Sequence, residues 1–146
     1  MSLELFGRPP TDIGERRTQD QWGAGYFGAA RAGRTHNGID ILFPAGSTIM
    51  AAVTGTVTKI GMPYADDIYR YVQITDKAGN NVRCFYVLPT VRLGQRVYKG
   101  DAIGLSQDLT LRYPGDAERE PMPCHVHLEI KTVTKQFIDP DEYEYS

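Results

Sequence analysis

The apolar residues of this chain fall in short runs, and no window repeats them every three to four residues as an amphipathic helix requires. The runs are rich in Val, Ile, Thr and Tyr and are bounded by Gly, Pro, Asn and Asp, which is typical of β-strands. The predicted strands are 39–43, 47–52, 55–60, 69–75, 82–88, 96–98, 101–105 and 125–132. This pattern predicts an all-β fold, a compact antiparallel β-sandwich or split barrel.

Three polar stretches lie outside these strands. Residues 1–20 are polar and contain proline, so we expect an N-terminal arm or tail followed by a single domain over residues 21–146. Residues 106–124 are too many for a plain hairpin connection, and long loops of this kind are often functional. The acidic end, DPDEYEY, is typical of a tail that faces solvent or a partner.

Composition and charge limit the partners that we expect. A chain of 146 residues is long enough for one domain with a core. A net charge of −2 without a dense Lys/Arg block argues against a nucleic-acid partner. No segment resembles a signal-peptide core or a membrane span, so we expect synthesis in the cytoplasm, followed by delivery to the periplasm or cell wall or carriage in a virion. The cysteines, Cys84 and Cys124, are too few for a disulfide scaffold, which favours free thiols over a bridge.

The segment CHVHLEI, residues 124–130, carries two of the three histidines. On a strand, His125, His127 and Glu129 share one face, because alternate side chains point the same way. Two imidazoles on one face can converge on a metal ion, or they can be a half-exposed surface pair. These seven residues alone do not separate the two interpretations.

The remaining histidine favours a metal site. His36 lies in RTHNGIDILFPAG, and Asp40 follows four residues later. With one or both of the distant histidines, this pair can form a nitrogen and oxygen site. Zinc with three protein ligands keeps a fourth position for water, which is the catalytic arrangement. The alternative is that His36 only packs or caps within a loop.

The segments HNGIDILFPAGSTIMAAVTGTV, VRLGQRVYKGDAIG and HVHLEI, in this order, resemble the lysostaphin-type zinc endopeptidases. The likeness covers roughly residues 22–140. It implies a small β-sandwich with one Zn²⁺ ion in an open groove, bound by His36, Asp40 and His127. It also implies that His125 handles the attacking water. The usual substrates of that family are the peptide cross-links of bacterial cell-wall peptidoglycan, reached here through a virion or a secretion machine.

The chain departs from that family at one catalytic position. A further histidine, in a Tyr-x-His-Leu segment, is matched by Val87 in CFYVLP. The same loss occurs in the leukocyte-cell-derived chemotaxins, a similar branch regarded as non-enzymatic. The segments GAGYFGAARAGRTHNGIDI, AGSTIMA and FYVLP of this chain have close counterparts in that branch. This chain lacks the secretion signal and the disulfide cysteines of that branch. We therefore expect reduced or absent hydrolysis, or alternatively a non-catalytic, zinc-containing binding or signalling module.

Several other side chains have more than one interpretation. Glu129 can orient a metal-binding histidine or pair with Arg83 or Lys131. Trp22 is expected to pack in the core. A tyrosine hydroxyl can replace the missing histidine as a donor, and the candidates are Tyr26, Tyr64, Tyr86 and Tyr113. Regular strand alternation makes Tyr86 the least suitable of these. A phosphocarrier-type domain is a further alternative, but it gives Asp40 no role.

Overall fold

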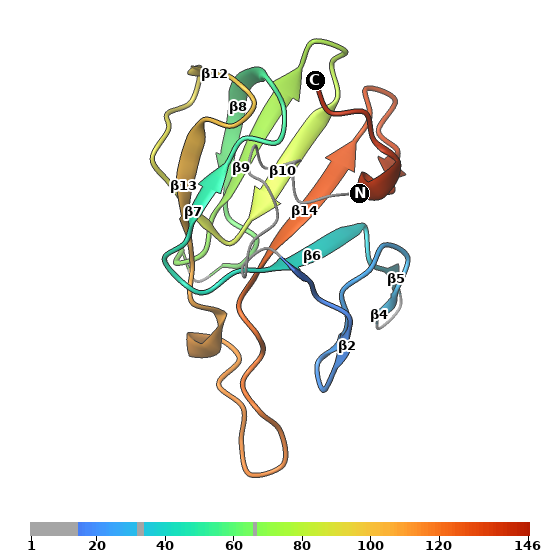
Figure 1. Cartoon of the computed structure of the whole chain (residues 1–146), viewed down its shortest axis with the longest axis vertical. Coiled ribbons are helices and arrows are strands. Elements are labelled where there is room, and N and C mark those ends of the chain that lie inside the picture. Colours follow the sequence, from blue (N-terminus) through green and yellow to red (C-terminus); the bar gives the residue numbers. More distant parts are fainter. Residues whose placement is uncertain (1–14, 32–33, 66) are drawn as a thin grey trace.

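The structure, a computed structural model, describes residues 15–31, 34–65 and 67–146. In these residues the larger sheet has eight strands in the order β1-β6-β14-β10-β9-β8-β12, with β15 also paired to β14 (Figure 1). Its strands are β1 (Glu15–Arg16), β6 (Gly38–Leu42), β8 (Gly55–Gly61), β9 (Tyr71–Asp76), β10 (Asn81–Phe85), β12 (Arg96–Val97), β14 (His125–Lys131) and β15 (Phe137–Ile138). The smaller sheet, in the order β11-β13-β7, consists of β7 (Thr48–Met50), β11 (Val87–Pro89) and β13 (Ala102–Ser106).

The remaining regular elements are short. Two further hairpins pair β2 (Gln19–Asp20) with β3 (Gly23–Ala24), and β4 (Ala30–Arg31) with β5 (Arg34–Thr35). The 3₁₀ turns η2 (Leu109–Leu111) and η3 (Pro140–Glu142) complete the described elements. All pairings in both sheets are antiparallel, so the predicted all-β antiparallel fold is confirmed. No helix with the length and apolar character of a membrane span occurs in the part of the chain that the structure describes.

The hydrophobic core lies between the two sheets and takes side chains from both. On β14, Val126, Leu128 and Ile130 are 0% exposed and point into this core. Burying an aliphatic side chain of this size stabilises the fold by roughly 1.5–3 kcal/mol. The alternate residues of β14 therefore lie on the opposite face of the larger sheet, as the sequence predicts. Both cysteines are free thiols, and Cys84 is part of the core.

The two ends of the described chain pack against the domain. Residues 1–14 of the predicted arm lie outside the described residues, whereas β1 pairs with β6 and Arg17 is buried. At the other end the acidic side chains are exposed, but Tyr143 and Tyr145 pack against the core. The prediction of a tail that faces solvent or a partner is therefore wrong for these two tyrosines, because their rings offer apolar surface that the core can cover.

The predicted long loop joins β13 to β14 and contains η2. Leu109 of η2 is 0% exposed and anchors the start of the loop. Figure 1 shows the rest of the loop projecting beyond the sheets, near the β2 hairpin. Trp22 connects these two features, because its Nε1–H donates to the Glu120 carbonyl oxygen at 2.8 Å.

Candidate metal centre

Strand pairing brings the two histidine-containing motifs together. Asp40 on β6 lies directly opposite His127 on β14. Gly38 lies opposite Glu129, and a Cβ at Gly38 would be only 2.1 Å from the Leu128 carbonyl oxygen. The glycine in HNGID therefore allows β6 to approach β14 closely enough for the two side chains to meet.

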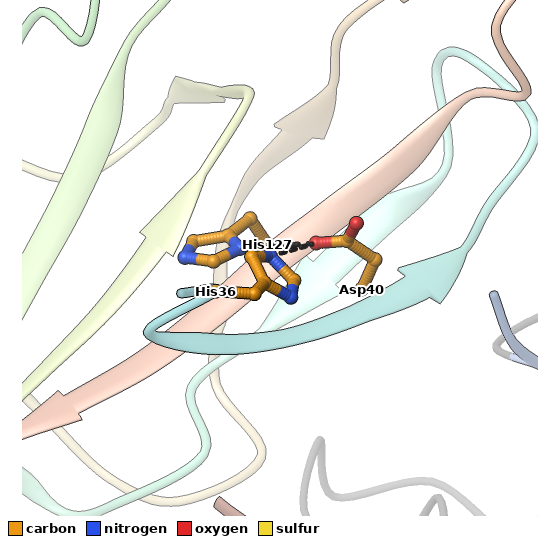
Figure 2. A group of neighbouring side chains, drawn as sticks. All are labelled: His36, Asp40 and His127. Carbon is orange, nitrogen blue, oxygen red and sulfur yellow. Dashed lines mark hydrogen bonds and ion pairs between the residues drawn. The ribbon is translucent and has the colours of Figure 1, made fainter. Parts of the chain in front are cut away.

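His36 precedes β6 and completes a cluster of three ligand atoms (Figure 2). Its Nε2 is 2.9 Å from His127 Nδ1 and 3.2 Å from Asp40 Oδ1, and His127 Nδ1 is 3.0 Å from the same oxygen. The ligand atoms of a tetrahedral zinc site are roughly 3.3–3.4 Å apart, since each lies about 2.0–2.1 Å from the ion. The donor set and its spacing therefore fit zinc after a small outward movement.

The outer contacts of the two imidazoles fix their tautomers. His36 Nδ1 donates to the Tyr26 carbonyl oxygen at 3.0 Å, and His127 Nε2 donates to Glu129 Oε1 at 3.0 Å. A carbonyl and an ionised carboxylate can only accept, so these protons are assigned from their partners. The lone pairs of His36 Nε2 and His127 Nδ1 then face the Asp40 carboxylate. Three such groups require a cation between them, either a proton or a metal ion.

The electrostatics of the cluster favour a proton on His127 when no metal ion is bound. Burial opposes a charge on His127, but hydrogen bonds to Asp40 and Glu129, with their negative charges, outweigh it and raise the pKa of His127 to about 9. Burial likewise opposes the charge of Asp40, yet its hydrogen bonds with His127 and His36 hold its pKa well below the usual range. Glu129 also lies 3.4 Å from Arg83 Nη1, so it has both roles that the sequence left open.

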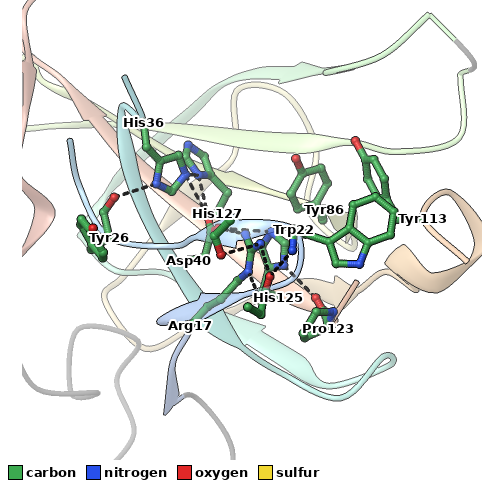
Figure 3. Close-up of polar contacts among 12 residues, drawn as sticks. Arg17, Trp22, Tyr26, His36, Asp40, Tyr86, Tyr113, Pro123, His125 and His127 are labelled. Atoms are coloured by element: carbon green, nitrogen blue, oxygen red, sulfur yellow. Dashed lines mark hydrogen bonds and ion pairs between the residues drawn. The ribbon is translucent and has the colours of Figure 1, made fainter. Parts of the chain in front are cut away.

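His125 lies beside the cluster and is not one of its three members. Its Nδ1 donates to the Pro123 carbonyl oxygen at 2.9 Å, and its Nε2 is 3.6 Å from Asp40 Oδ2 (Figure 3). Burial lowers the pKa of His125 despite the nearby charge of Asp40. The ring is therefore neutral at neutral pH, and the lone pair on Nε2 is available to accept a proton.

A cleft of about 470 Å³ opens over the cluster and over His125. Tyrosines form part of its wall: Tyr64 Oη is 3.1 Å from Tyr86 Oη and 2.6 Å from Tyr113 Oη. Burial raises the pKa of Tyr86 to about 12 and also raises that of Tyr64, so both hydroxyls keep their protons at neutral pH. Tyr26 contributes only its carbonyl oxygen, and its side chain is exposed.

The structure places Val87, which was predicted to occupy the altered catalytic position, away from the cleft. Val87 is 0% exposed and belongs to the core, and the cleft is lined instead by Phe85 and Tyr86. The cause is the backbone of Tyr86, whose φ of 69° breaks the regular alternation between β10 and β11. Phe85 lies opposite His127 in the β10–β14 register, with their ring centroids 5.1 Å apart. Tyr86, predicted to be the least suitable tyrosine, faces the His125 ring at 5.4 Å.

Sequence reasoning missed or misplaced two residues of the site. The Arg17 side chain is buried and its Nη1 donates to Asp40 Oδ2 at 2.8 Å. No local pattern marks this arginine, because its burial depends on pairing between distant segments. Trp22 was expected in the core, but it is half-buried and lines the cleft, with its ring edge-on to Tyr113.

Comparison with known sequences gives one family and several relatives. The sequence profile of peptidase family M23 matches residues 34–140. Leukocyte cell-derived chemotaxin-2 of Mus musculus is 32% identical over 117 residues, which cover 79% of this chain and 72% of the relative. Myeloid protein 1 of Gallus gallus is 29% identical over 128 residues, covering 84% of this chain but only 36% of that protein.

Comparison with solved structures supports the same fold. A mutant catalytic domain of the prophage-encoded M23 protein EnpA from Enterococcus faecalis superposes with a TM-score of 0.66 and 19% identity, over 94% of this chain and 97% of that one. The catalytic domain of the antimicrobial peptidase lysostaphin from Staphylococcus simulans superposes with a TM-score of 0.62 and 19% identity, over 86% of this chain and 96% of that one. A zinc-containing peptidase from Vibrio cholerae superposes with a TM-score of 0.62 and 21% identity, over 92% of this chain but 41% of that one.

Proposed function

The chain belongs to peptidase family M23, and from that premise we propose that it is a zinc-dependent peptidase domain acting on the peptide cross-links of bacterial cell-wall peptidoglycan. His36, Asp40 and His127 would hold the zinc ion. The observation that carries the proposal is the convergence of three potential ligand atoms, one from each residue, beside the neutral imidazole of His125.

His125 and the cleft tyrosines each have a role in this chemistry. Zinc, when bound, polarises a peptide carbonyl and acidifies water. His125 accepts the proton of the attacking water at Nε2 and returns it to the leaving amine. The hydroxyls of Tyr64, Tyr86 and Tyr113 in the cleft wall are the donors available to the developing oxyanion.

The descriptions of two similar structures support the proposed substrate class. One similar structure is a peptidase described as antimicrobial, and another is encoded by a prophage. Both descriptions support a bacterial cell-wall target, and we propose that the chain reaches it through a virion or a secretion machine. Trp22, between β2 and β3, and Tyr113 and Met122 of the long loop line the cleft, so the β2 hairpin and this loop would contact the substrate.

We expect hydrolysis to be slow. The segment matched to the family's further histidine presents Phe85 and Tyr86 to the cleft, and neither is an imidazole. Loss of one preorganised donor at an oxyanion typically lowers turnover by about 10²–10³-fold. The 32% identity to chemotaxin-2 favours a second candidate function, a zinc-containing module that binds peptide or wall fragments without cleaving them.

The deciding experiment measures zinc content and then the release of new amino groups from purified peptidoglycan of several cross-link types. Wild type, His127→Ala and His125→Asn are compared. Zinc-dependent release that disappears in both variants supports the peptidase. Binding to peptidoglycan without release supports the second function. A wild-type protein that takes up no zinc would overturn both.

A further inference from the structure

The side chain of Arg17 joins the N-terminal segment to the candidate metal centre (Figure 3). It is only 4% exposed. Its Nη1 donates to Asp40 Oδ2 at 2.8 Å, while Nε and Nη2 donate to the two carboxylate oxygens of Asp20 at 2.7 and 2.9 Å. The guanidinium is therefore fixed between two carboxylates, one of which belongs to the metal cluster.

The two oxygens of Asp40 face different partners. Oδ1 points to His36 and His127, at 3.2 and 3.0 Å. Oδ2 accepts from Arg17 and lies 3.6 Å from His125 Nε2. With Oδ2 held in this way, only Oδ1 is presented to the position between the two imidazoles.

We propose that Arg17 is a positioning residue for the metal centre: it holds Asp40 so that the carboxylate binds the ion through one oxygen. This inference rests on the proposed zinc function. A carboxylate bound through both oxygens would occupy the additional position that a catalytic zinc site keeps for water. Outer partners of this kind orient metal ligands and typically change metal affinity by about 10–100-fold when they are removed.

The backbone around Arg17 is built to hold this contact. The Arg17 N–H donates to the Asp40 carbonyl oxygen at 2.9 Å, and the Asp40 N–H donates to the Gly25 carbonyl oxygen at 2.8 Å. A Cβ at Gly25 would be 2.8 Å from the Cβ of Arg17, so the chain can close over this arginine only with glycine there. Arg17 and Gly25 lie outside the 34–140 region that matches the family profile.

Two other roles for Arg17 predict different results. If Arg17 acted only through its charge, its removal would tighten metal binding, because a positive charge near a cation is unfavourable. If it acted only as a buried ion pair, its removal would lower stability without changing the metal site. A positioning role predicts weaker binding, because Asp40 must then be ordered when the ion binds.

The test compares wild type with Arg17→Met. The control variant is Arg70→Met, which removes an arginine that pairs with an aspartate, Asp67, away from the metal centre. Zinc affinity is measured by chelator competition, the coordination number from the visible bands of the Co²⁺-loaded protein, and folding by chemical denaturation. We expect Arg17→Met to bind zinc about 10–100-fold more weakly and to show weaker Co²⁺ bands, indicating a higher coordination number. Arg70→Met should match wild type in both readouts.

A second variant covers a failure of Arg17→Met to fold. Arg17→Lys keeps the charge but cannot form the planar fork to Asp40 and Asp20, so we expect zinc affinity to fall at least about tenfold. Unchanged or tighter zinc binding in the folded variants overturns the inference. Absence of zinc binding by the wild type would instead overturn the proposed function, so the two failures are distinguishable.

Discussion

Each side chain of the metal cluster has a partner on the side away from the cluster. The Tyr26 carbonyl oxygen accepts from His36, Glu129 accepts from His127, and Arg17 donates to Asp40. These contacts fix ring orientation and tautomer before any ion arrives. Ordering three ligands in advance reduces the conformational entropy lost on binding, which is the physical reason to expect tight metal binding from only three residues.

Position 85, rather than 87, should respond to a restored imidazole. We predict that Phe85→His, facing the cleft opposite His127, raises the rate of peptidoglycan cleavage by about 10²–10³-fold over wild type. Val87→His should instead place an unsatisfied imidazole in the core, lower stability by roughly 1–3 kcal/mol, and give no gain in rate. Rates from zinc-loaded proteins and urea denaturation check both. A gain confined to Val87→His would contradict this placement of the strand.

The protonation of His127 predicts a pH dependence of stability in the metal-free protein. Its pKa of about 9 in the fold is above the ordinary value of 6.5, so the folded state binds the proton more tightly. The resulting stabilisation is complete below pH 6.5 and is lost as the pH rises through about 9. We expect the free energy of unfolding to fall by up to roughly 3 kcal/mol over this range. Chemical denaturation in chelator at several pH values measures it.

Zinc should remove that loss, because the metal binds the unprotonated imidazole and replaces the proton. The zinc-saturated protein is therefore the control, with stability that does not fall over the same range. Equal stability of the metal-free protein at pH 6 and pH 9.5 would contradict the assigned protonation.

The pairing of β6 with β14 carries the geometry of the site. Gly38→Ala would place a methyl group 2.1 Å from the Leu128 carbonyl oxygen, so the strands must separate where Asp40 meets His127. We predict a stability loss of roughly 1–3 kcal/mol together with weaker zinc binding. Ile41→Val on the core face of β6 is the control, with a stability loss of about 0.5–1.5 kcal/mol and normal zinc affinity. Calorimetric zinc titrations distinguish the two.

Strand alternation made the faces of β14 predictable, because its apolar and polar residues follow the two-residue period without a break. The meeting of His36, Asp40 and His127 was likewise predictable, since few residue types bind metal ions and these are concentrated in two motifs. The segment 82–88 was not predictable in the same way. Tyr86 adopts a positive φ, which non-glycine residues rarely do, and that one backbone angle turns Val87 into the core.

Contacts between distant segments explain what the sequence did not reveal across the whole molecule. Arg17 and Trp22 are single residues in polar stretches, and their positions depend on how the N-terminal segment and the long loop pack around the sheet. The two C-terminal tyrosines are similar: both rings pack against the core, and Tyr143 Oη donates to Asp76. Only long-range pairing could distinguish these residues from solvated ones.

Stability and metal binding should be separable at the C-terminal end. Removing residues 143–146 deletes two aromatic rings that pack against the core and the carbonyl oxygen that accepts from the Thr54 N–H. We predict a loss of roughly 2–4 kcal/mol in the free energy of unfolding, with unchanged zinc affinity at a temperature where the variant remains folded. Denaturation and zinc competition on the same preparation test this, and weaker zinc binding would show that the end of the chain supports the site.

The donor set of the candidate metal centre also bears on which ion it would bind. Two imidazole nitrogens and one carboxylate oxygen do not discriminate strongly among first-row divalent metals, and such donors generally bind Cu²⁺ more tightly than Zn²⁺. Affinity alone would therefore not select Zn²⁺ at this site. The occupant would instead depend on which metals the surroundings supply and buffer, so the same polypeptide would be loaded differently in two compartments.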